Sequence, residues 1–289
     1  MREDELAYYS TPGPMTTLDP NSDAFEGLSA DPSAVGPFVQ GLILHEFWAA
    51  SYGVEIPPTR ADEVETRGAS AMVELIKRLD PAPTGVARPP DRRMIGNCRH
   101  FSTLSCAVLR RSGIPARARC GFATYFEPDR YVDHWVVEYW EPELARWRRV
   151  DNQLDQVQRD ALTLDFDPTD VPAGKFLDGA EAWQMCRAGA ADPERFGILD
   201  FWGLWFVRNN VVRDLAALNK MELLPWDGWG LMNDEQGGGP ASSLVDRVAQ
   251  AIVADDWLEI RRLYDENDLL RVPEHVVSYR AGTTVPVFV

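Results

Sequence analysis

The stretch Met94–Phe126 reads MIGNCRHFSTLSCAVLRRSGIPARARCGFATYF and carries Cys98 near its start. Asn97 precedes the cysteine, and an asparagine side chain can cap the first N–H groups of a helix. Apolar residues then recur at helical spacing until Gly113 and Pro115 end the pattern. We therefore predict a buried helix with Cys98 in its first turn. The positive end of a helix dipole favours a thiolate, so Cys98 is a candidate nucleophile.

Two later segments supply a base and a group that could orient it. His134 begins the alternating segment HWVVEYW, and Asp151 follows the short segment RWRRV, which we predict to be two strands. A nucleophile, a base and a third group that holds the base make up the general arrangement for covalent acyl transfer. His100 should lie on a different helix face from Cys98, and Asp133 should face away from His134. Neither is therefore expected to be the base or its orienter.

Four motifs in this order resemble the transglutaminase-like superfamily, the papain-like thiol enzymes with Cys, His and Asp in sequence. They are GNC at 96–98, RRSGIPAR at 110–117, DHW at 133–135 and RVD at 149–151. The resemblance covers roughly residues 70–155 and is closest to a bacterial, stand-alone type. It implies that Cys98 is the nucleophile, His134 the general base and acid, and Asp151 the orienter of His134. It also implies an α+β fold in which the cysteine helix packs on an antiparallel sheet.

The oxyanion of such a reaction needs two donors. The backbone N–H of Cys98 is one candidate. Papain-like enzymes often add a Gln a few residues before the cysteine, but the preceding PPDRRMIGN contains none. The second donor therefore stays open.

Composition and pattern divide the chain into three parts. Residues 1–37 are rich in Pro, Gly, Ser and Asp, and we expect them to form an extended N-terminal arm. Residues 38–155 should form the catalytic core. Residues 156–289 should form a mainly helical extension packed on the core. The expected helices cover 38–52, 60–79, 179–189, 197–220 and 243–265. Residues 152–178 look like an acidic loop, and the tail VPVFV like an edge strand.

Charge and cysteine usage limit the partners and the compartment. The formal net charge of −16 argues against general binding of nucleic acid or of anionic membranes. The N-terminus lacks the apolar run of a signal peptide, and no stretch has the length of a membrane span. The four cysteines, at 98, 106, 120 and 186, form no CxxC pair. We predict a reduced, cytoplasmic protein whose other three cysteines are buried.

Two segments resemble metal sites only in part. His45-Glu46 lacks the second histidine of an HExxH motif, and Asp165, Asp167 and Asp170 lack the glycine and the glutamate of a calcium loop. We therefore predict no metal and no cofactor.

The predicted function is acyl transfer on an amide or thioester through an acyl-enzyme at Cys98. The reaction would form or hydrolyse an amide bond of a small or carrier-protein-bound acyl group. A cysteine peptidase and a non-catalytic interaction protein remain alternatives. Residues 86–120 carry eight arginines against one acid, Asp91. Arg92, Arg93 and Arg99 lie nearest to Cys98 and are candidates for binding an anionic substrate. The alternative is that the arginines pair with acids of the flanking segments.

Overall fold

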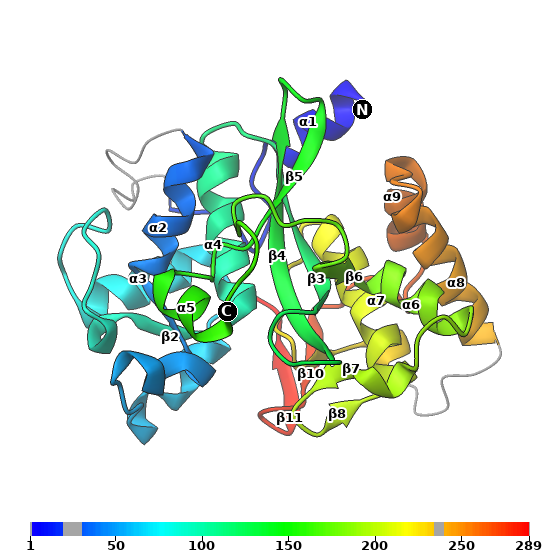
Figure 1. The fold of residues 1–289 in the computed structure, drawn as a ribbon. Coiled ribbons are helices and arrows are strands. Elements are labelled where there is room, and N and C mark those ends of the chain that lie inside the picture. Colours follow the sequence, from blue (N-terminus) through cyan, green and yellow to red (C-terminus); the bar gives the residue numbers. More distant parts are fainter. Residues whose placement is uncertain (1, 20–30, 234–239, 289) are drawn as a thin grey trace. The chain divides into compact units, whose positions relative to one another are not determined.

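The computed structural model describes residues 2–19, 31–233 and 240–288. The chain forms two compact units, one of Met1–Ala118 with Val136–Val171 and one of Arg119–Trp135 with Pro172–Val289. The boundary passes through two strands, β3 (Ala116–Ala123) and β4 (Tyr131–Glu141). Each unit is described by itself below, and Figure 1 shows the elements of both. Helices and strands are mixed in both units, which confirms the predicted α+β class.

Helices dominate the first unit. They are α1 (Glu3–Tyr9), α2 (Val35–Gln40), α3 (Ala69–Leu79), α4 (Cys98–Arg111) and α5 (Gln156–Leu162). The α4 helix packs against α2, α3 and a short parallel pair of strands, β1 (Ile43–His45) and β2 (Met94–Gly96). Because β2 runs directly into α4, the β1–β2 pairing fixes the position at which the cysteine helix begins.

The α4 helix follows the sequence prediction closely. Asn97 is its N-cap, and Gly113 lies beyond its C-terminal end with a φ of 72°, a left-handed conformation that glycine adopts without strain. Every residue from Cys98 to Arg110 is buried. A helix buried on all sides is held by tertiary packing rather than by helix propensity alone.

The main sheet has the strand order β6-β3-β4-β7-β8, and β5 also pairs with β4. Its strands are β3 (Ala116–Ala123), β4 (Tyr131–Glu141), β5 (Arg146–Val150), β6 (Phe176–Asp178), β7 (Phe196–Ile198) and β8 (Phe201–Trp202). In the first unit, β4 and β5 are antiparallel with Val137 opposite Val150. In the second unit, β3 is antiparallel to β6, and β4 is parallel to β7.

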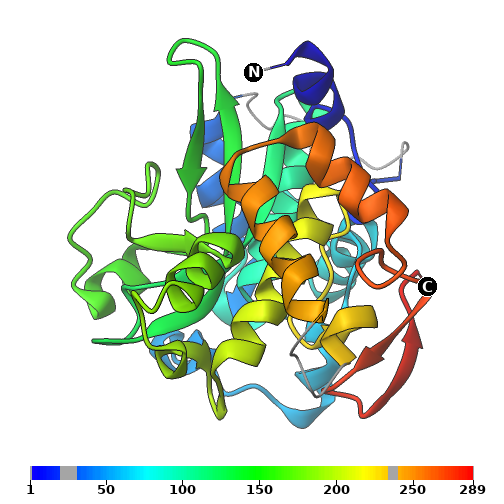
Figure 2. The same ribbon diagram turned by 90° about the vertical axis from the view of Figure 1, so that its right-hand side faces the viewer.

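The second unit has a helical layer of α6 (Gly179–Arg187), α7 (Leu204–Leu218), α8 (Pro240–Val253) and α9 (Trp257–Glu266). Here α6 packs on α7 and α8, and α8 packs on α9, as Figure 2 shows. A small sheet joins β9 (Asp227–Gly228), β10 (His275–Ser278) and β11 (Thr283–Pro286). The predicted strand in the tail is thus present as β11, displaced toward the N-terminus.

Several predicted elements were wrong in their extent. The single helix expected over residues 38–52 is instead α2, β1 and a 3₁₀ helix, Glu46–Tyr52. The expected helix 60–79 divides into a 3₁₀ helix, Pro58–Glu65, and α3. Residues 197–220 begin with β7 and β8 before α7 starts. Glycines at 41, 68 and 203 stand at these breaks, where they cap a helix end.

Two segments expected to lack regular structure contain helices. Residues 3–9, in the arm predicted to be extended, form α1, and residues 156–162, in the predicted acidic loop, form α5. Asp155 starts α5 because its side chain accepts a hydrogen bond from the Gln158 N–H. Part of the arm, residues 20–30, lies outside the described residues. The division into arm, core and extension remains a prediction.

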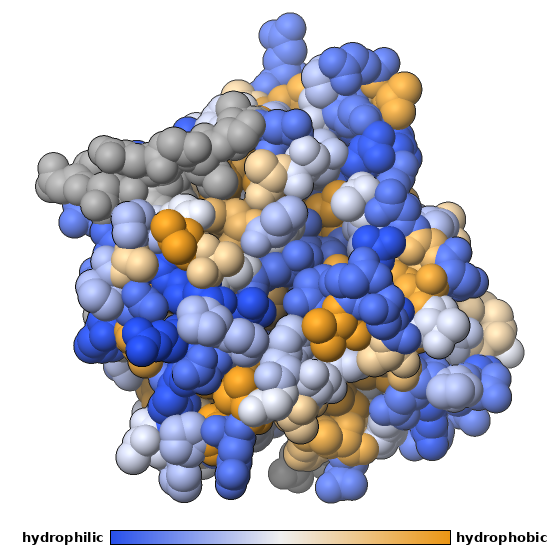
Figure 3. Space-filling model, turned by 60° about the vertical axis from the view of Figure 1, so that its left-hand side comes forward, coloured by the Kyte–Doolittle hydropathy of each residue, from blue (hydrophilic) through white to orange (hydrophobic). Residues whose placement is uncertain are grey.

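Figure 3 shows one face of the molecule, on which hydrophilic side chains are interspersed with smaller groups of apolar ones. Scattered apolar side chains are normal on a protein surface. Within the described ranges, no helix is both long enough and apolar enough to cross a membrane.

Candidate active site

Cys98 is the first residue of α4 and is 7% exposed. The Asn97 side chain accepts a hydrogen bond from the Arg99 N–H at 3.1 Å, which caps the helix end beside the thiol. Gly96 is required for this arrangement, since a Cβ there would lie 2.9 Å from a methyl group of Ile43. The helix end thus holds Cys98 in the setting that lowers the free energy of a thiolate.

His100 completes the cap of the same helix. Its Nδ1 accepts a hydrogen bond from the Asn97 N–H at 3.1 Å, and its Nε2 lies 3.0 Å from the carbonyl oxygen of Thr66. The two bonds together fit the neutral ring with the proton on Nε2. Burial, followed by the charge of Arg99, lowers the pKa of His100 well below its usual value. His100 therefore acts in helix capping.

His134 lies on β4 in the second unit and is 2% exposed. Two aromatic rings contact its imidazole edge-on, Phe126 with centroids 4.9 Å apart and Tyr125 at 6.0 Å. The sequence analysis gave these two residues no role, although they end the stretch Met94–Phe126; they lie just beyond β3 (Ala116–Ala123). They restrict the orientations that the imidazole can take.

Asp133, the neighbour of His134, has a different partner. Its Oδ1 accepts a hydrogen bond from the Asn210 side chain of α7 at 2.6 Å. Burial raises the pKa of Asp133, although Asn210 and the charge of Arg213 oppose the shift. The Asp133 side chain is thus hydrogen-bonded to α7, as expected of a residue that faces away from His134.

Asp151 directly follows β5 and is 3% exposed. Its Oδ1 accepts a hydrogen bond from the Gln153 N–H at 3.1 Å, and its own N–H donates to the carbonyl oxygen of Pro168 at 2.8 Å. Cys98 and Asp151 belong to the first unit and His134 to the second. The meeting of the three side chains therefore remains a prediction.

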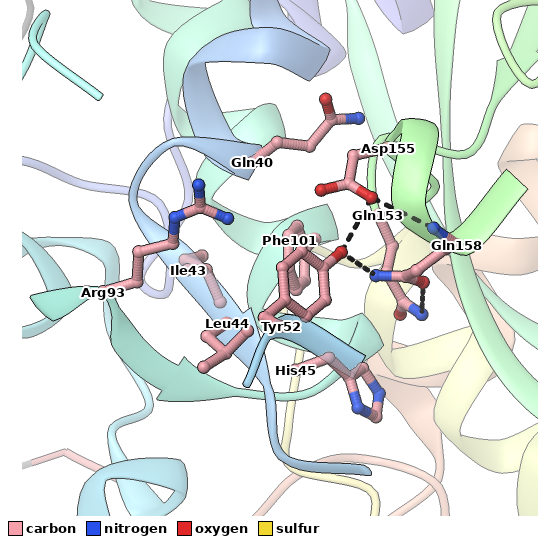
Figure 4. A pocket seen from close by; sticks show the side chains of 10 residues that line it. All are labelled: Gln40, Ile43, Leu44, His45, Tyr52, Arg93, Phe101, Gln153, Asp155 and Gln158. Atoms are coloured by element: carbon pink, nitrogen blue, oxygen red, sulfur yellow. Dashed lines mark hydrogen bonds between the residues drawn. The ribbon is translucent and has the colours of Figure 1, made fainter. Parts of the chain in front are cut away.

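The three candidate substrate arginines lie in different surroundings. The Arg92 side chain is 60% exposed and lies 3.7 Å from Asp80. Arg99 is fully buried, and its guanidinium donates to the carbonyl oxygen of Thr66 at 3.5 Å. Arg93 is half-buried and lines a small hollow, which Figure 4 shows. Because a buried side chain is poorly placed to meet a substrate, Arg99 is the least suited of the three.

Other arginines near the cysteine pair with acids, as the alternative interpretation expected. Arg117 binds Glu138 at 2.8 Å in the first unit. In the second unit, Arg119 lies 2.6 Å from Asp178 and 2.8 Å from Asp214. Burial raises the pKa of Asp214 even so, although the Arg119 charge opposes the shift. These ion pairs are buried, so breaking one by removing a partner should cost several kcal/mol, on the order of 3–5.

Two of the three remaining cysteines are buried as predicted. Cys106 and Cys120 are 0% exposed, whereas Cys186 is half-buried. Burial raises the pKa of the Cys186 thiol to about 11. In the part of the chain that the structure describes, no three His, Cys, Asp or Glu side chains gather in a way that could hold a metal ion.

Comparison with known proteins agrees with the resemblance seen in the motifs. Residues 77–152 match the Transglutaminase-like superfamily, and this segment contains Cys98, His134 and Asp151. This segment of the chain is therefore similar to the transglutaminase-like superfamily, as the motifs predicted. The superfamily in general includes cysteine enzymes of acyl transfer and hydrolysis.

The wider comparisons add little to this segment. No curated protein matches the chain. Among solved structures, the red sea bream transglutaminase is similar over 44% of this chain, with 17% identity and a TM-score of 0.30. The similar region spans 22% of that enzyme.

Proposed function

We propose that this protein is a thiol-dependent enzyme that transfers or hydrolyses an acyl group through an acyl-enzyme at Cys98. In this proposal His134 is the general base and acid, and Asp151 fixes the tautomer and direction of the His134 ring. One observation carries it. Cys98 stands at the capped N-terminus of a buried helix, inside the segment that matches a superfamily of cysteine enzymes.

The chemistry has two steps. The Cys98 thiolate attacks the carbonyl carbon of an amide or thioester, and His134 gives its proton to the leaving amine or thiol. His134 then removes a proton from water or from an amine, which attacks the acyl-enzyme and restores the thiolate. Water gives a hydrolase, and an amine gives a new amide bond. The Cys98 N–H at the helix end is one donor to the oxyanion.

The proposed substrate is a small or carrier-bound acyl compound, and the proposed location is the cytoplasm. Both rest on the sequence prediction alone. The buried surroundings of Cys98, His134 and Asp151, each at most 7% exposed, favour a site from which bulk water is largely excluded.

Intact-protein mass spectrometry with pools of acyl thioesters and amides tests the proposal. We expect a covalent adduct with the mass of one acyl group, which disappears in Cys98→Ala and persists in Cys106→Ala. The second variant is a matched control, because Cys106 lies in the same helix and is also buried. An adduct that persists in Cys98→Ala, or the absence of any adduct across the pools, would favour the non-catalytic alternative.

A further inference from the structure

Four exposed apolar side chains lie close together in the sequence of the second unit. Leu199 is 63% exposed, Phe201 52%, Leu204 36% and Trp205 46%. The rings of Phe201 on β8 and Trp205 on α7 are arranged edge to face, with centroids 6.3 Å apart, so the strand and the helix share one apolar surface. We call these four residues the apolar edge patch. Single exposed apolar residues are normal, but a group of large ones marks a site of interaction.

The patch includes a strand at the end of the main sheet. In the order β6-β3-β4-β7-β8, the last strand pairs only with β7, and its other side faces no described strand (Figure 1). Such an edge is a template for a further strand, and proteins commonly block it with lysine or proline. β8 consists of Phe201 and Trp202, so only its shortness limits further pairing.

Two charges without an ionic partner lie at the two ends of β8. Asp200 directly precedes the strand and is exposed, and no described residue forms an ion pair with it. Arg130 is exposed as well. Its guanidinium lies over the Trp202 ring, 4.5 Å from the centroid, and donates to the carbonyl oxygen of Glu194 at 2.8 Å. Among the described residues, no carboxylate pairs with this cation. The edge therefore has an anion at its start and a cation at its end.

We propose that the apolar edge patch is the contact surface of a symmetric dimer, in which the β8 strands of two copies of this chain pair antiparallel. A two-fold axis places the same patch on both sides of the interface, so the apolar side chains of one copy cover those of the other. It also reverses the direction of the second strand. The anion at the start of one β8 then meets the cation at the end of the other, twice in each dimer.

The backbone of the hairpin fixes the register of this pairing. The Gly203 N–H donates to the Phe196 carbonyl oxygen at 3.1 Å, and hydrogen-bonded pairs alternate along an antiparallel ladder. The backbone groups of Trp202 therefore point away from β7 and toward the free edge. They can pair with a second copy when the two Phe201 residues lie opposite each other. The turn at Asp200 then lies beside Trp202 of the second copy, where the guanidinium over that ring is its counterion.

The area of the patch fits the centre of a modest interface. An aromatic side chain has about 150–250 Å² to bury, so the half-exposed Phe201 and Trp205 together offer roughly that much, and the two leucines add to it. A standard interface buries about 800 Å² on each copy, much of it in a polar rim. Because β8 offers few backbone hydrogen bonds, we expect a micromolar dissociation constant.

A second copy explains the charges better than an unrelated occupant does. A lipid surface would leave Asp200 without a counterion, and a different protein would need two charges of its own in matching positions. A copy of this chain supplies both by symmetry. Dimerisation does not require that Cys98 react, so the inference goes beyond the proposed function and can fail independently of it.

Sedimentation velocity of the full chain at about 1–200 µM tests the inference. We expect the protein to change from monomer to dimer as its concentration rises. Phe201→Lys and Trp205→Lys should each weaken the dimer by about tenfold or more, because the interface would then bury a charge against apolar groups. Leu258→Lys is the matched control, since Leu258 is 51% exposed but lies on α9, and it should leave the dimer unchanged. Circular dichroism should show an intact fold in all three variants.

Charge reversal tests the register. Asp200→Arg and Arg130→Asp each place two pairs of like charges in the dimer, and each should weaken it by roughly fivefold or more. In an equimolar mixture of the two variants, the mixed dimer has opposite charges at both contacts and should form more readily than either variant alone. Mixing cannot reverse an effect that lies within one chain. A wild-type protein that stays monomeric, a dimer unaffected by Phe201→Lys and Trp205→Lys, or a mixture no stronger than its components would each overturn the inference.

Discussion

The stability of the first unit should depend on pH through His100. The ring is buried, and the hydrogen bonds with the Asn97 N–H and the Thr66 carbonyl oxygen fit the neutral form with its proton on Nε2. Protonation would place a charge in a buried site next to Arg99, and it would replace the hydrogen bond that Nδ1 accepts from the Asn97 N–H by one donated to Asn97 Oδ1, 3.0 Å away. The folded state therefore resists protonation, whereas the unfolded chain takes up a proton near its ordinary pKa of about 6.5. Since the folded pKa is the lower one, stability is complete above pH 6.5 and is lost as the pH falls below it.

The magnitude follows from proton linkage. Between pH 6.5 and 5.5 the free energy of unfolding should fall by about 1 kcal/mol from this group, with a limiting slope of about 1.4 kcal/mol per pH unit below that. His100→Gln removes the titration but keeps an acceptor for Asn97 and a donor for Thr66. Gln is also a usual residue at this position of a capping box.

Urea unfolding followed by circular dichroism at pH 7.5, 6.5 and 5.5 measures the effect. The compared quantity is the free energy of unfolding of wild type minus that of His100→Gln, in which the titration of groups common to both proteins cancels. This difference should change only slightly between pH 7.5 and 6.5, so that interval is an internal control. We expect the difference to shift by about 1 kcal/mol in favour of the variant between pH 6.5 and 5.5. A difference that stays constant over that interval would refute the assignment of a neutral, buried His100.

Three further outcomes follow from the site and the packing. Iodoacetamide should label Cys98 faster than the other three cysteines at pH 6, which peptide mass mapping would show; equal labelling would contradict an activated thiol. Asp151→Asn should reduce turnover roughly 10³–10⁴-fold with the fold intact, as the corresponding change does in a Ser-His-Asp enzyme. Near-normal turnover would mean that another residue orients His134. Gly121→Ala places a Cβ 2.1 Å from a backbone oxygen of β6 and should cost about 1–3 kcal/mol in thermal or urea unfolding, whereas Gly85→Ala, where the Cβ meets nothing within 4 Å, should be nearly neutral.

The parts of the fold that the sequence predicts correctly have local signals. Asn97 and Gly113 mark the two ends of α4, and β5 occupies the residues expected of it, Arg146–Val150. In both cases the residues that decide the structure lie within or next to the element. Caps and alternation are local effects, so one sequence is enough to find them.

The parts that it predicts wrongly depend on distant residues. Residues 43–45 have a helical apolar pattern, yet they form β1 because they pair with β2, about fifty residues later in the chain. Helix periodicity over a short apolar run cannot reveal such a partner. The hollow that Arg93 lines was missed for the same reason, since part of its lining comes from residues 153–158.

The candidate site shows the same difference between features with a local sequence signal and features that depend on distant residues. The order of Cys98, His134 and Asp151 predicts the residue types needed for acyl transfer, and all three lie inside the segment that matches the superfamily. Counting charges near Cys98 did not distinguish the buried Arg99 from the half-buried Arg93. Burial depends on the tertiary structure, and in this chain it decides which arginine could meet a ligand.

The α7 helix shows how a segment outside the superfamily match can control the predicted base. It carries many apolar residues, but Asn210, Arg213 and Asp214 on it are also buried. Asn210 donates to Asp133 at 2.6 Å and accepts from Arg213 at 3.1 Å, and Asp214 accepts from the backbone of β3. The strand residue next to His134 is thus held by a helix that begins about fifty residues beyond the matched segment. Such buried polar networks contribute little net stability but specify one arrangement of the elements that they join. The C-terminal half of the chain is therefore needed to fix the backbone at the predicted base, and the matched segment alone would not hold His134 in one position.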